Sequence, residues 1–241
     1  IIANESAGTL NLKTIEKKIR ASDLHYPPTR LIALENTHNY CMGSPIKPEY
    51  MRQIGGLAKK YNLKIHVDGA RIFNAAVAMA VDVKDLVIDT NSVMFCLSKG
   101  LSAPVGSLVC GNKEFINKAR KWRKMVGGGM RQSGHLAAAG IIALNELVCE
   151  LKKDHYNAQI LAQGLAKIKK IDIRPELVKT NIIFFSLKHP SLSPEEFIKK
   201  LDAQGIKILM IQPEIFRIVL HREITETQVE QVIRVLAELI K

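Results

Sequence analysis

Residues 93–106 read VMFCLSKGLSAPVG, a short apolar run that passes directly into a stretch of Gly, Ser and Pro containing Lys99. The apolar run predicts a buried strand, and the residues after it predict a turn. A lysine at the end of a buried strand loses part of its hydration, which lowers its pKa from the ordinary value of about 10.4. The neutral amine is then available for Schiff-base chemistry. For an isolated Ser-Lys-Gly triplet, a solvated lysine in an ordinary loop is the alternative.

Asp68 lies 31 residues upstream of Lys99, in the stretch HVDGAR over residues 66–71. Ile65 and Val67 alternate with polar residues, so they predict a strand that ends at this aspartate. A carboxylate and a lysine at the ends of separate strands are the two groups that a pyridoxal 5′-phosphate site needs. One serves the ring nitrogen and the other the aldehyde. Asp followed by Gly also fits a simple turn, but the presence of the lysine favours the cofactor site.

Composition and charge exclude several classes of protein. The chain has 241 residues, 47% of them hydrophobic, and no apolar run approaches the roughly eighteen residues of a membrane span, so we expect no membrane contact. Four cysteines without CxxC spacing are typical of reduced thiols in a cytoplasmic protein. The net charge is +12, but Lys and Arg are spread over predicted helices with acidic residues between them. This pattern predicts solvated faces and a site for anionic ligands, and no nucleic-acid partner.

Alternating strand and helix signals predict an α/β fold with a mostly parallel sheet that helices cover on both faces. Shorter units follow after a boundary near residue 150, and Ser193 with Glu196 and Thr225 with Gln228 match the capping box at the starts of two helices. Strands are expected at 30–35, 63–67, 92–97, 106–110, 181–187, 206–210 and 216–221, and helices at 48–61, 112–125, 132–152 and 154–169, then after Ser193 and after Thr225.

Short motifs follow one another along the chain in a fixed order. They are ENTHN at 35–39, HVDGARIFNA at 66–75, SKGLSAPVGS at 98–107, RKMVGGGMRQ at 123–132, Asp154-His155, Thr180-Asn181 and RIVLH at 217–221. Together they resemble the low-specificity L-threonine aldolase family, and the resemblance covers essentially the whole chain. Motifs in series are far more specific than any one of them alone.

The resemblance implies an aminotransferase-like fold of type I. Residues 1–150 would form the large cofactor-binding domain, incomplete at its N-terminus, and residues 151–241 a small C-terminal α/β domain. The implied reaction is the pyridoxal-phosphate-dependent cleavage of L-threonine, L-allo-threonine and related β-hydroxy-α-amino acids to glycine and an aldehyde. Two alternatives stay open: another enzyme of this fold, such as a β-eliminating lyase or aminotransferase, and a non-catalytic remnant. Product analysis separates the aldolase from the other enzymes of this fold, because the aldolase releases glycine and an aldehyde and the others release ammonia and a keto acid.

The resemblance also assigns roles at the cofactor. Lys99 would bond to the cofactor aldehyde, and Asp68 would keep the pyridine nitrogen protonated so that the ring accepts electrons. Arg71 would lie close to both cofactor and substrate. The glycines at 127–129 predict a loop that presents Arg131. In the family this arginine reaches the cofactor phosphate of a neighbouring subunit, which implies a dimer or homotetramer with its active site at the interface.

Other residues would serve the amino-acid substrate. Arg217 would hold the α-carboxylate, since a guanidinium makes two parallel hydrogen bonds. Lys124 would add positive potential, although a solvated lysine is the alternative. His25 falls where the family carries a histidine near the β-hydroxyl, and its pKa suits a base. His38 and His66 are interpreted as structural, with His38 supporting a turn and His66 packing on the face opposite Asp68.

The chain also departs from the family pattern. Ser102 stands where glycine is usual, and Asn91 stands where aspartate is usual. No group with a chemical role is lost in these changes. The chain begins at Ile1, and an upstream segment of the family supplies a phosphate loop and a histidine that stacks on the cofactor. We therefore expect residues 1–241 alone to bind pyridoxal phosphate poorly.

Overall fold

A computed structural model describes residues 4–21, 23–188 and 192–240. The chain divides into two compact units, Ile1–Cys41 with Pro45–Cys149 and Met42–Ser44 with Glu150–Lys241. Each unit has its own sheet and its own hydrophobic core, and each is described by itself.

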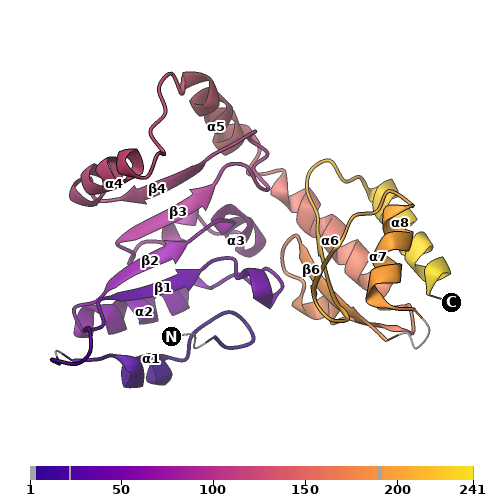
Figure 1. Ribbon diagram of the computed structural model, residues 1–241, viewed down its shortest axis with the longest axis horizontal. Coiled ribbons are helices and arrows are strands. Elements are labelled where there is room, and N and C mark those ends of the chain that lie inside the picture. Colours follow the sequence, from indigo (N-terminus) through magenta and orange to yellow (C-terminus); the bar gives the residue numbers. More distant parts are fainter. Residues whose placement is uncertain (1–3, 22, 189–191, 241) are drawn as a thin grey trace. The chain divides into compact units, whose positions relative to one another are not determined.

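The first unit is built on a four-stranded sheet in the order β1-β2-β3-β4 (Figure 1). Parallel pairing joins β1 to β2 and β2 to β3, whereas β4 runs antiparallel to β3. The mostly parallel α/β sheet predicted from the alternating pattern is therefore confirmed. The strands are β1 (Leu31–Glu35), β2 (Lys64–Asp68), β3 (Ser92–Cys96) and β4 (Ser107–Gly111).

One face of β1 and β2 packs on helices. The side chains of Ile32 and Val67 point into a core that also contains Met51 and Ile54, because alternate strand residues share a face. The opposite face is open, because Leu31 and Ala33, which point to that face, are exposed. The expectation that helices cover both faces is thus wrong for these two strands. The helices beside the core are α1 (Leu12–Lys18), α2 (Pro48–Lys60) and α3 (Ile72–Met79), with short 3-10 turns at Asn39–Cys41 and Val83–Leu86.

Two further helices, α4 (Lys113–Met125) and α5 (Gly134–Glu146), follow β4. All five residues of β4 are exposed, and no residue of α4 is buried. The predicted helix over 132–152 instead ends at Glu146, and the next helix begins at Leu151. Two helices were missed by the sequence analysis. α1 buries only Ile15, so its apolar periodicity is weak, and α3 directly follows the HVDGAR motif.

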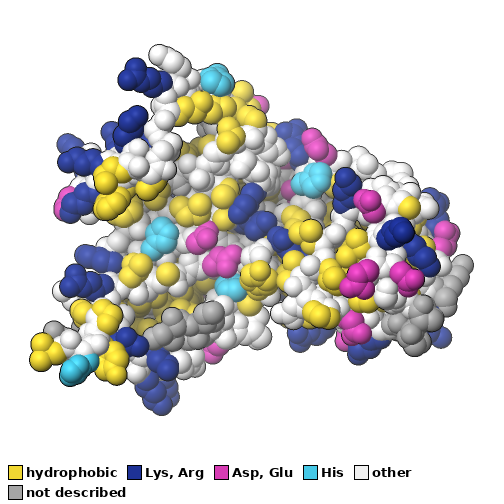
Figure 2. All heavy atoms as spheres, viewed as in Figure 1, with side chains coloured by type: hydrophobic (Ala, Val, Ile, Leu, Met, Phe, Trp, Pro, Cys, Tyr) yellow, Lys and Arg dark blue, Asp and Glu magenta, His cyan; other side chains and the backbone are white. Residues whose placement is uncertain are grey.

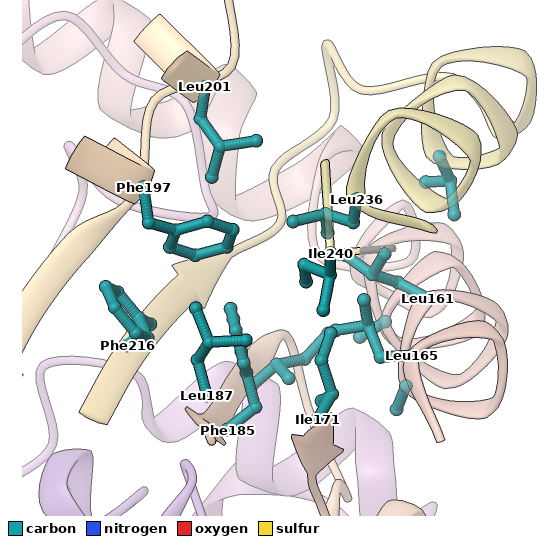
Figure 3. Packing of buried hydrophobic residues seen from close by; sticks show 14 of the residues in the cluster. Leu161, Leu165, Ile171, Phe185, Leu187, Phe197, Leu201, Phe216, Leu236 and Ile240 are labelled. Atoms are coloured by element: carbon teal, nitrogen blue, oxygen red, sulfur yellow. The ribbon is translucent and has the colours of Figure 1, made fainter. Parts of the chain in front are cut away.

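The second unit combines three helices with an antiparallel sheet in the order β5-β6-β8-β7. Its core is aromatic at the centre: the rings of Phe197 and Phe216 meet edge to face at 4.9 Å, and Phe185 stacks on Phe216 at 5.4 Å (Figure 3). Both predicted capping boxes are confirmed. The elements are α6 (Leu151–Leu165), β5 (Ile171–Asp172), a 3-10 turn at Pro175–Leu177, β6 (Ile182–Leu187), α7 (Pro194–Asp202), β7 (Leu209–Gln212), β8 (Ile215–Val219) and α8 (Glu226–Leu239).

Among the described residues, no single helix is long and apolar enough to cross a membrane, and α5 and α6 meet that test only when taken together as a broken pair.

Candidate active site

The carboxyl ends of the parallel strands carry the predicted cofactor residues. Asp68 is the last residue of β2 and stands in register with Glu35, the last residue of β1. Lys99 lies three residues beyond the end of β3, the next strand of the sheet. Ligands of open α/β sheets bind outside the carboxyl ends of the strands. The structure therefore places Asp68 and Lys99 at the same edge of the sheet, Asp68 at the end of β2 and Lys99 in the loop after β3.

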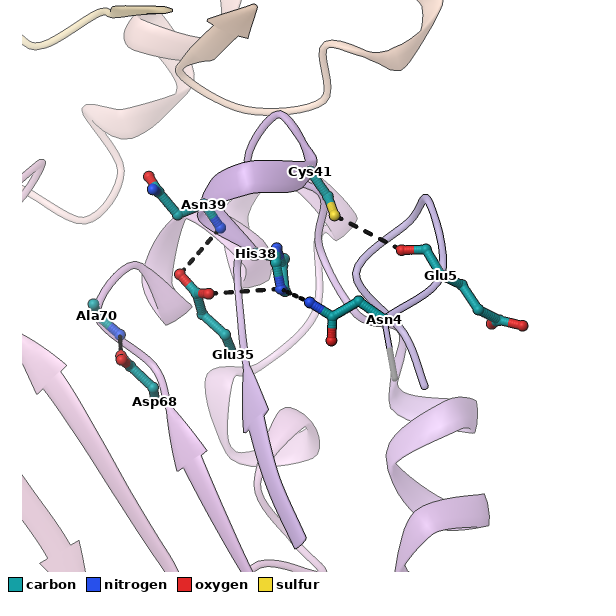
Figure 4. A network of polar contacts seen from close by, with 8 residues as sticks. All are labelled: Asn4, Glu5, Glu35, His38, Asn39, Cys41, Asp68 and Ala70. Carbon is teal, nitrogen blue, oxygen red and sulfur yellow. Dashed lines mark hydrogen bonds and ion pairs between the residues drawn. The ribbon is translucent and has the colours of Figure 1, made fainter. Parts of the chain in front are cut away.

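Asp68 is exposed, and its side chain also shapes the turn that follows it. Its Oδ1 accepts a hydrogen bond of 3.0 Å from the N–H of Ala70 (Figure 4). Gly69 is required in this turn, because a Cβ at this position would lie 2.8 Å from the carbonyl oxygen of Met94. Asp68 is thus both a turn residue, as the simpler interpretation held, and a carboxylate open to a ligand.

Lys99 is exposed, so the burial expected at the end of an apolar strand is not found. The loop after β3 turns its apolar side chains inward instead, and Leu97 and Leu101 are buried while the lysine between them is not. Ser102 holds the turn with φ of +59°, and its N–H donates to the carbonyl of Lys99 at 2.8 Å.

A hollow of about 210 Å³ opens beside Asp68 on the uncovered face of β1 and β2. His66 lines it, because residues two apart in a strand share a face. The expectation that His66 packs opposite Asp68 is therefore wrong. Its Nδ1 lies 2.8 Å from the hydroxyl of Ser92, which fixes the ring. Neither Lys99 nor His25 lines this hollow.

The hollow has a second polar wall, of which the sequence analysis assigned a role to His38 only. His38 is buried; its Nε2 lies 2.8 Å from Nδ2 of Asn4 and 3.7 Å from Oε2 of Glu35 (Figure 4). The other oxygen of Glu35 accepts the N–H of Asn39 at 3.0 Å. The ENTHN motif was the available signal for this network. His38 supports the turn as expected, and Glu35 connects that turn to the strand end.

The remaining predicted residues of the first unit lie outside the hollow. Arg71 is half-buried at the start of α3, three residues after Asp68. Lys124, near the end of α4, and Arg131, in the loop before α5, are both exposed. His25 is exposed in the loop between α1 and β1, where its N–H donates to Oδ1 of Asp23 at 2.7 Å.

Arg217 belongs to the second unit, at the centre of β8. It is half-buried and lies between Phe184 of β6 and Leu209 of β7 in the sheet register. This position matches the expectation of a strand arginine with few charged neighbours along the strand.

The profile of the family described as beta-eliminating lyase matches residues 1–188 of this chain. The chain belongs to the beta-eliminating lyase family. Curated relatives include the probable low-specificity L-threonine aldolase 2 of Arabidopsis thaliana, which is 46% identical over 235 residues, covering 96% of this chain and 66% of that protein. The low specificity L-threonine aldolase of Escherichia coli (strain K12) is 40% identical over 226 residues, covering 93% of this chain and 65% of that protein.

Solved structures agree on the fold of this beta-eliminating lyase family member. Leishmania major threonine aldolase matches 98% of this chain and 69% of its own with a TM-score of 0.79 at 19% identity. The putative L-allo-threonine aldolase of Listeria monocytogenes matches 98% and 66% with a TM-score of 0.77 at 18% identity. The expected aminotransferase-like fold of type I is therefore confirmed. The chain spans about two thirds of the length of the two curated relatives described above, 66% and 65%.

Proposed function

We propose that this chain supplies the cofactor and substrate groups of a threonine aldolase, which cleaves L-threonine, L-allo-threonine and related β-hydroxy-α-amino acids to glycine and an aldehyde. The observation that carries the proposal is the placement of Asp68 and Lys99 at the carboxyl ends of neighbouring parallel strands. The identity of 46% to a protein named as a probable low-specificity L-threonine aldolase supports the choice of reaction.

The residues at the strand ends fit pyridoxal 5′-phosphate. The carboxylate of Asp68 opens into the hollow, where it would hold the proton on the ring nitrogen. The amine of Lys99 is exposed, so it would be free to bond to the aldehyde and to give way to the amine of the substrate. When bound, the cofactor supplies an acceptor for the electrons released as the Cα–Cβ bond breaks.

Substrate groups come from other parts of the chain. Arg217 would bind the α-carboxylate through two parallel hydrogen bonds, which a planar guanidinium makes better than a lysine. His25 would accept the proton of the β-hydroxyl, because the pKa of a histidine lies near neutral pH. Arg71 and Lys124 would add positive charge toward the anionic substrate.

The exposed region after β3 supports a homo-oligomer, dimer or tetramer. Ten of the eighteen large apolar side chains exposed among the described residues lie between residues 105 and 142. Figure 2 shows apolar side chains among basic ones over the part of the first unit that carries α4. Exposed apolar patches of this kind are typical of protein–protein contacts. Arg131, exposed in the same region, would reach the cofactor phosphate of a neighbouring subunit.

We also propose a cytoplasmic location. All four cysteines are free thiols, which suits a reducing compartment.

Borohydride reduction of the chain with bound pyridoxal phosphate tests the central assignment. Reduction should fix the pyridoxal group to the peptide that contains Lys99, and Lys99→Ala should abolish this labelling. Lys84→Ala removes an exposed lysine elsewhere in the same unit and should leave it intact. Labelling that persists in the Lys99→Ala chain on the same peptide would show that another group holds the cofactor.

Product analysis with L-threonine tests the reaction. Glycine and acetaldehyde are expected from the chain when pyridoxal phosphate is added at a concentration high enough to offset the weak binding expected above. Ammonia with a keto acid would instead assign the chain to β-elimination.

A further inference from the structure

Two buried asparagines hold the turn Leu220–Thr225, which joins β8 to α8. Asn157 of α6 donates its amide N–H to the carbonyl of Ile224 at 2.8 Å, and Asn181 donates to the carbonyl of Leu220 at 2.8 Å. The N–H of Leu220 donates in return to the carbonyl of Asn181 at 2.9 Å. Both asparagines are almost fully buried. The carboxyl end of the strand that carries Arg217 is therefore fixed at two backbone positions.

Asp154 is a third buried polar side chain at the same turn. It precedes Asn157 by three residues on α6, so the two side chains share one side of the helix. Only 1% of Asp154 is exposed, and within the described residues neither of its carboxylate oxygens accepts a hydrogen bond. Buried polar groups in proteins nearly always have a partner, and a buried unpaired charge is costly. The two asparagines are satisfied at the turn, but the aspartate is not.

The charged groups that act on Asp154 come from the turn and from its own helix. His221 and Arg222, both in the turn, attract the carboxylate, and Glu150, one turn earlier along α6, repels it. His221 and Arg222 are exposed, whereas the carboxylate is buried. Arg222 also attracts Glu150, so the two acidic groups compete for one guanidinium.

We propose that Asp154 is a positioning residue for Arg217: its carboxyl group, neutral in one state and charged in the other, sets the position of the turn Leu220–Thr225. The proposal rests on the proposed function of Arg217 as the clamp for the substrate carboxylate. The neutral acid stays buried without an ionic partner. The carboxylate draws His221 and Arg222 inward, and the backbone of the turn follows because both residues belong to it.

The link to the substrate is short. Leu220 lies three residues after Arg217, so a displacement of the turn reaches β8 along the backbone, and the hydrogen bonds of Asn181 to Leu220 limit its size. Burial raises the pKa of Asp154 to about 6, so both forms of the side chain are populated near neutral pH. The affinity of the clamp should therefore change with pH.

An NMR titration of the full chain between about pH 5 and pH 8 tests the coupling without any substrate. The backbone amides of Leu220 and Ile224 and the Nε–H of Arg217 should move along one curve with a midpoint near pH 6. This curve should vanish in Asp154→Asn, which keeps the shape and removes the charge. Asp202→Asn makes the same chemical change at an exposed site of the same unit and should leave the curve as it is.

His221 belongs to the same turn and carries an ionisable side chain of its own, so His221→Gln is the second variant. The midpoint should persist in His221→Gln with a smaller amplitude. The proposal is overturned if the curve survives in Asp154→Asn, or if it is lost in His221→Gln, or if the amides of the wild-type chain do not titrate.

The Michaelis constant for L-threonine provides the functional measurement. With cofactor bound, KM should change several-fold over the same pH range in the wild-type chain and stay level in Asp154→Asn, with kcat nearly unchanged. An intact NMR curve in a chain that does not cleave threonine would contradict the proposed function and leave the coupling standing. If the enzyme is active and its KM depends on Arg217, but the NMR curve is missing, the coupling through Asp154 is contradicted and the proposed function stands.

Discussion

Asp154 and His155 follow one another on α6, and burial shifts their pKa values in opposite directions. The pKa of Asp154 rises from its ordinary 3.8 to about 6, and that of His155 falls from 6.5 to about 4. Burial has one effect in both cases, because it disfavours the charged form. The charged form of the aspartate exists at high pH and that of the histidine at low pH.

These shifts make opposite contributions to the pH dependence of stability. The contribution of Asp154 is fully present below its unfolded pKa and is lost as pH rises through about 6. The contribution of His155 is fully present above 6.5 and is lost as pH falls toward 4. Each amounts to at most about 3 kcal/mol, since one pKa unit is about 1.4 kcal/mol. Between pH 4 and 6 the two largely cancel.

Substituting either residue should expose the contribution of the other. Relative to wild type, His155→Gln should gain about 2 kcal/mol of unfolding free energy as pH falls from 6.5 to 4, because the histidine penalty is gone. Asp154→Asn should lose a similar amount relative to wild type over this range. Urea denaturation at several pH values measures both. The exposed His25→Gln serves as control, and curves that run parallel for all chains would show that burial does not shift these groups.

Ser102 adopts the left-handed backbone conformation, with φ of +59°. A side chain at such a position costs about 1 kcal/mol, and glycine adopts it freely. Ser102→Gly should therefore raise the unfolding free energy by roughly 0.5–1 kcal/mol, net of the entropy that glycine adds to the unfolded chain. Ser107→Gly, at the start of β4, should lower it instead. Denaturant midpoints of the two variants measure the change in unfolding free energy. An equal loss of unfolding free energy in both variants would contradict the prediction.

At the scale of the element, α8 shows how a short signal fixes a helix end. Thr225 accepts the N–H of Gln228, and the side chain of Gln228 accepts the N–H of Thr225 at 2.8 Å. The helix that starts here contributes Val229 and Leu236 to the core of the second unit. The cap therefore stabilises the N-terminus of α8 and, with it, the packing of this helix in the core of the second unit.

Removing this cap should cost stability. Thr225→Ala should lower the unfolding free energy by about 1 kcal/mol, because the backbone N–H of Gln228 loses the hydroxyl that accepts its hydrogen bond. Thr225→Ser keeps the hydroxyl and should restore most of the loss. Thermal and urea denaturation of the two variants measure the effect, and an equal loss in both would assign the role of Thr225 to its methyl group.

At the scale of the whole molecule, charge and apolar surface combine in the region from β4 to α5. Helix α4 carries six Lys and Arg residues and one Glu, and β4 has no buried residue. Trp122 and Val126 are 62% and 77% exposed at the end of α4. Proteins rarely leave this much apolar surface to water unless a partner covers it.

We therefore expect the chain to sediment as a dimer or larger species, well above the 26.9 kDa of one copy. Trp122→Lys should shift the population toward the single copy, because it places a charge in an apolar contact. Leu24→Lys, at a fully exposed residue of another loop, should leave the distribution unchanged. Analytical ultracentrifugation over a range of concentrations provides the test. A wild-type chain that stays a single copy at high concentration would contradict the expectation.

The sequence determined by itself the elements that depend on local chemistry. Alternation along β2, Pro48 at the start of α2 and the two capping boxes each involve residues within a turn or two of one another, so a linear pattern contains them. The order of the motifs along the chain also predicted the fold type. Helix α1 escaped prediction because it is only seven residues long and buries only Ile15.

Tertiary structure alone decided exposure and pairing. The apolar run before Lys99 predicted a buried lysine, but the loop buries Leu97 and Leu101 and leaves the amine in solvent. Because side chains alternate along a strand, the sequence implies that His66 and Asp68 share one face of the sheet. Only the structure shows that helices pack on the opposite face and leave the face of His66 open. Asp154 is buried against a turn nearly seventy residues away along the chain, and its carboxylate accepts no hydrogen bond from the residues that the structure describes. Burial is a property of what the folded chain brings together, and the sequence states only which groups are available for it.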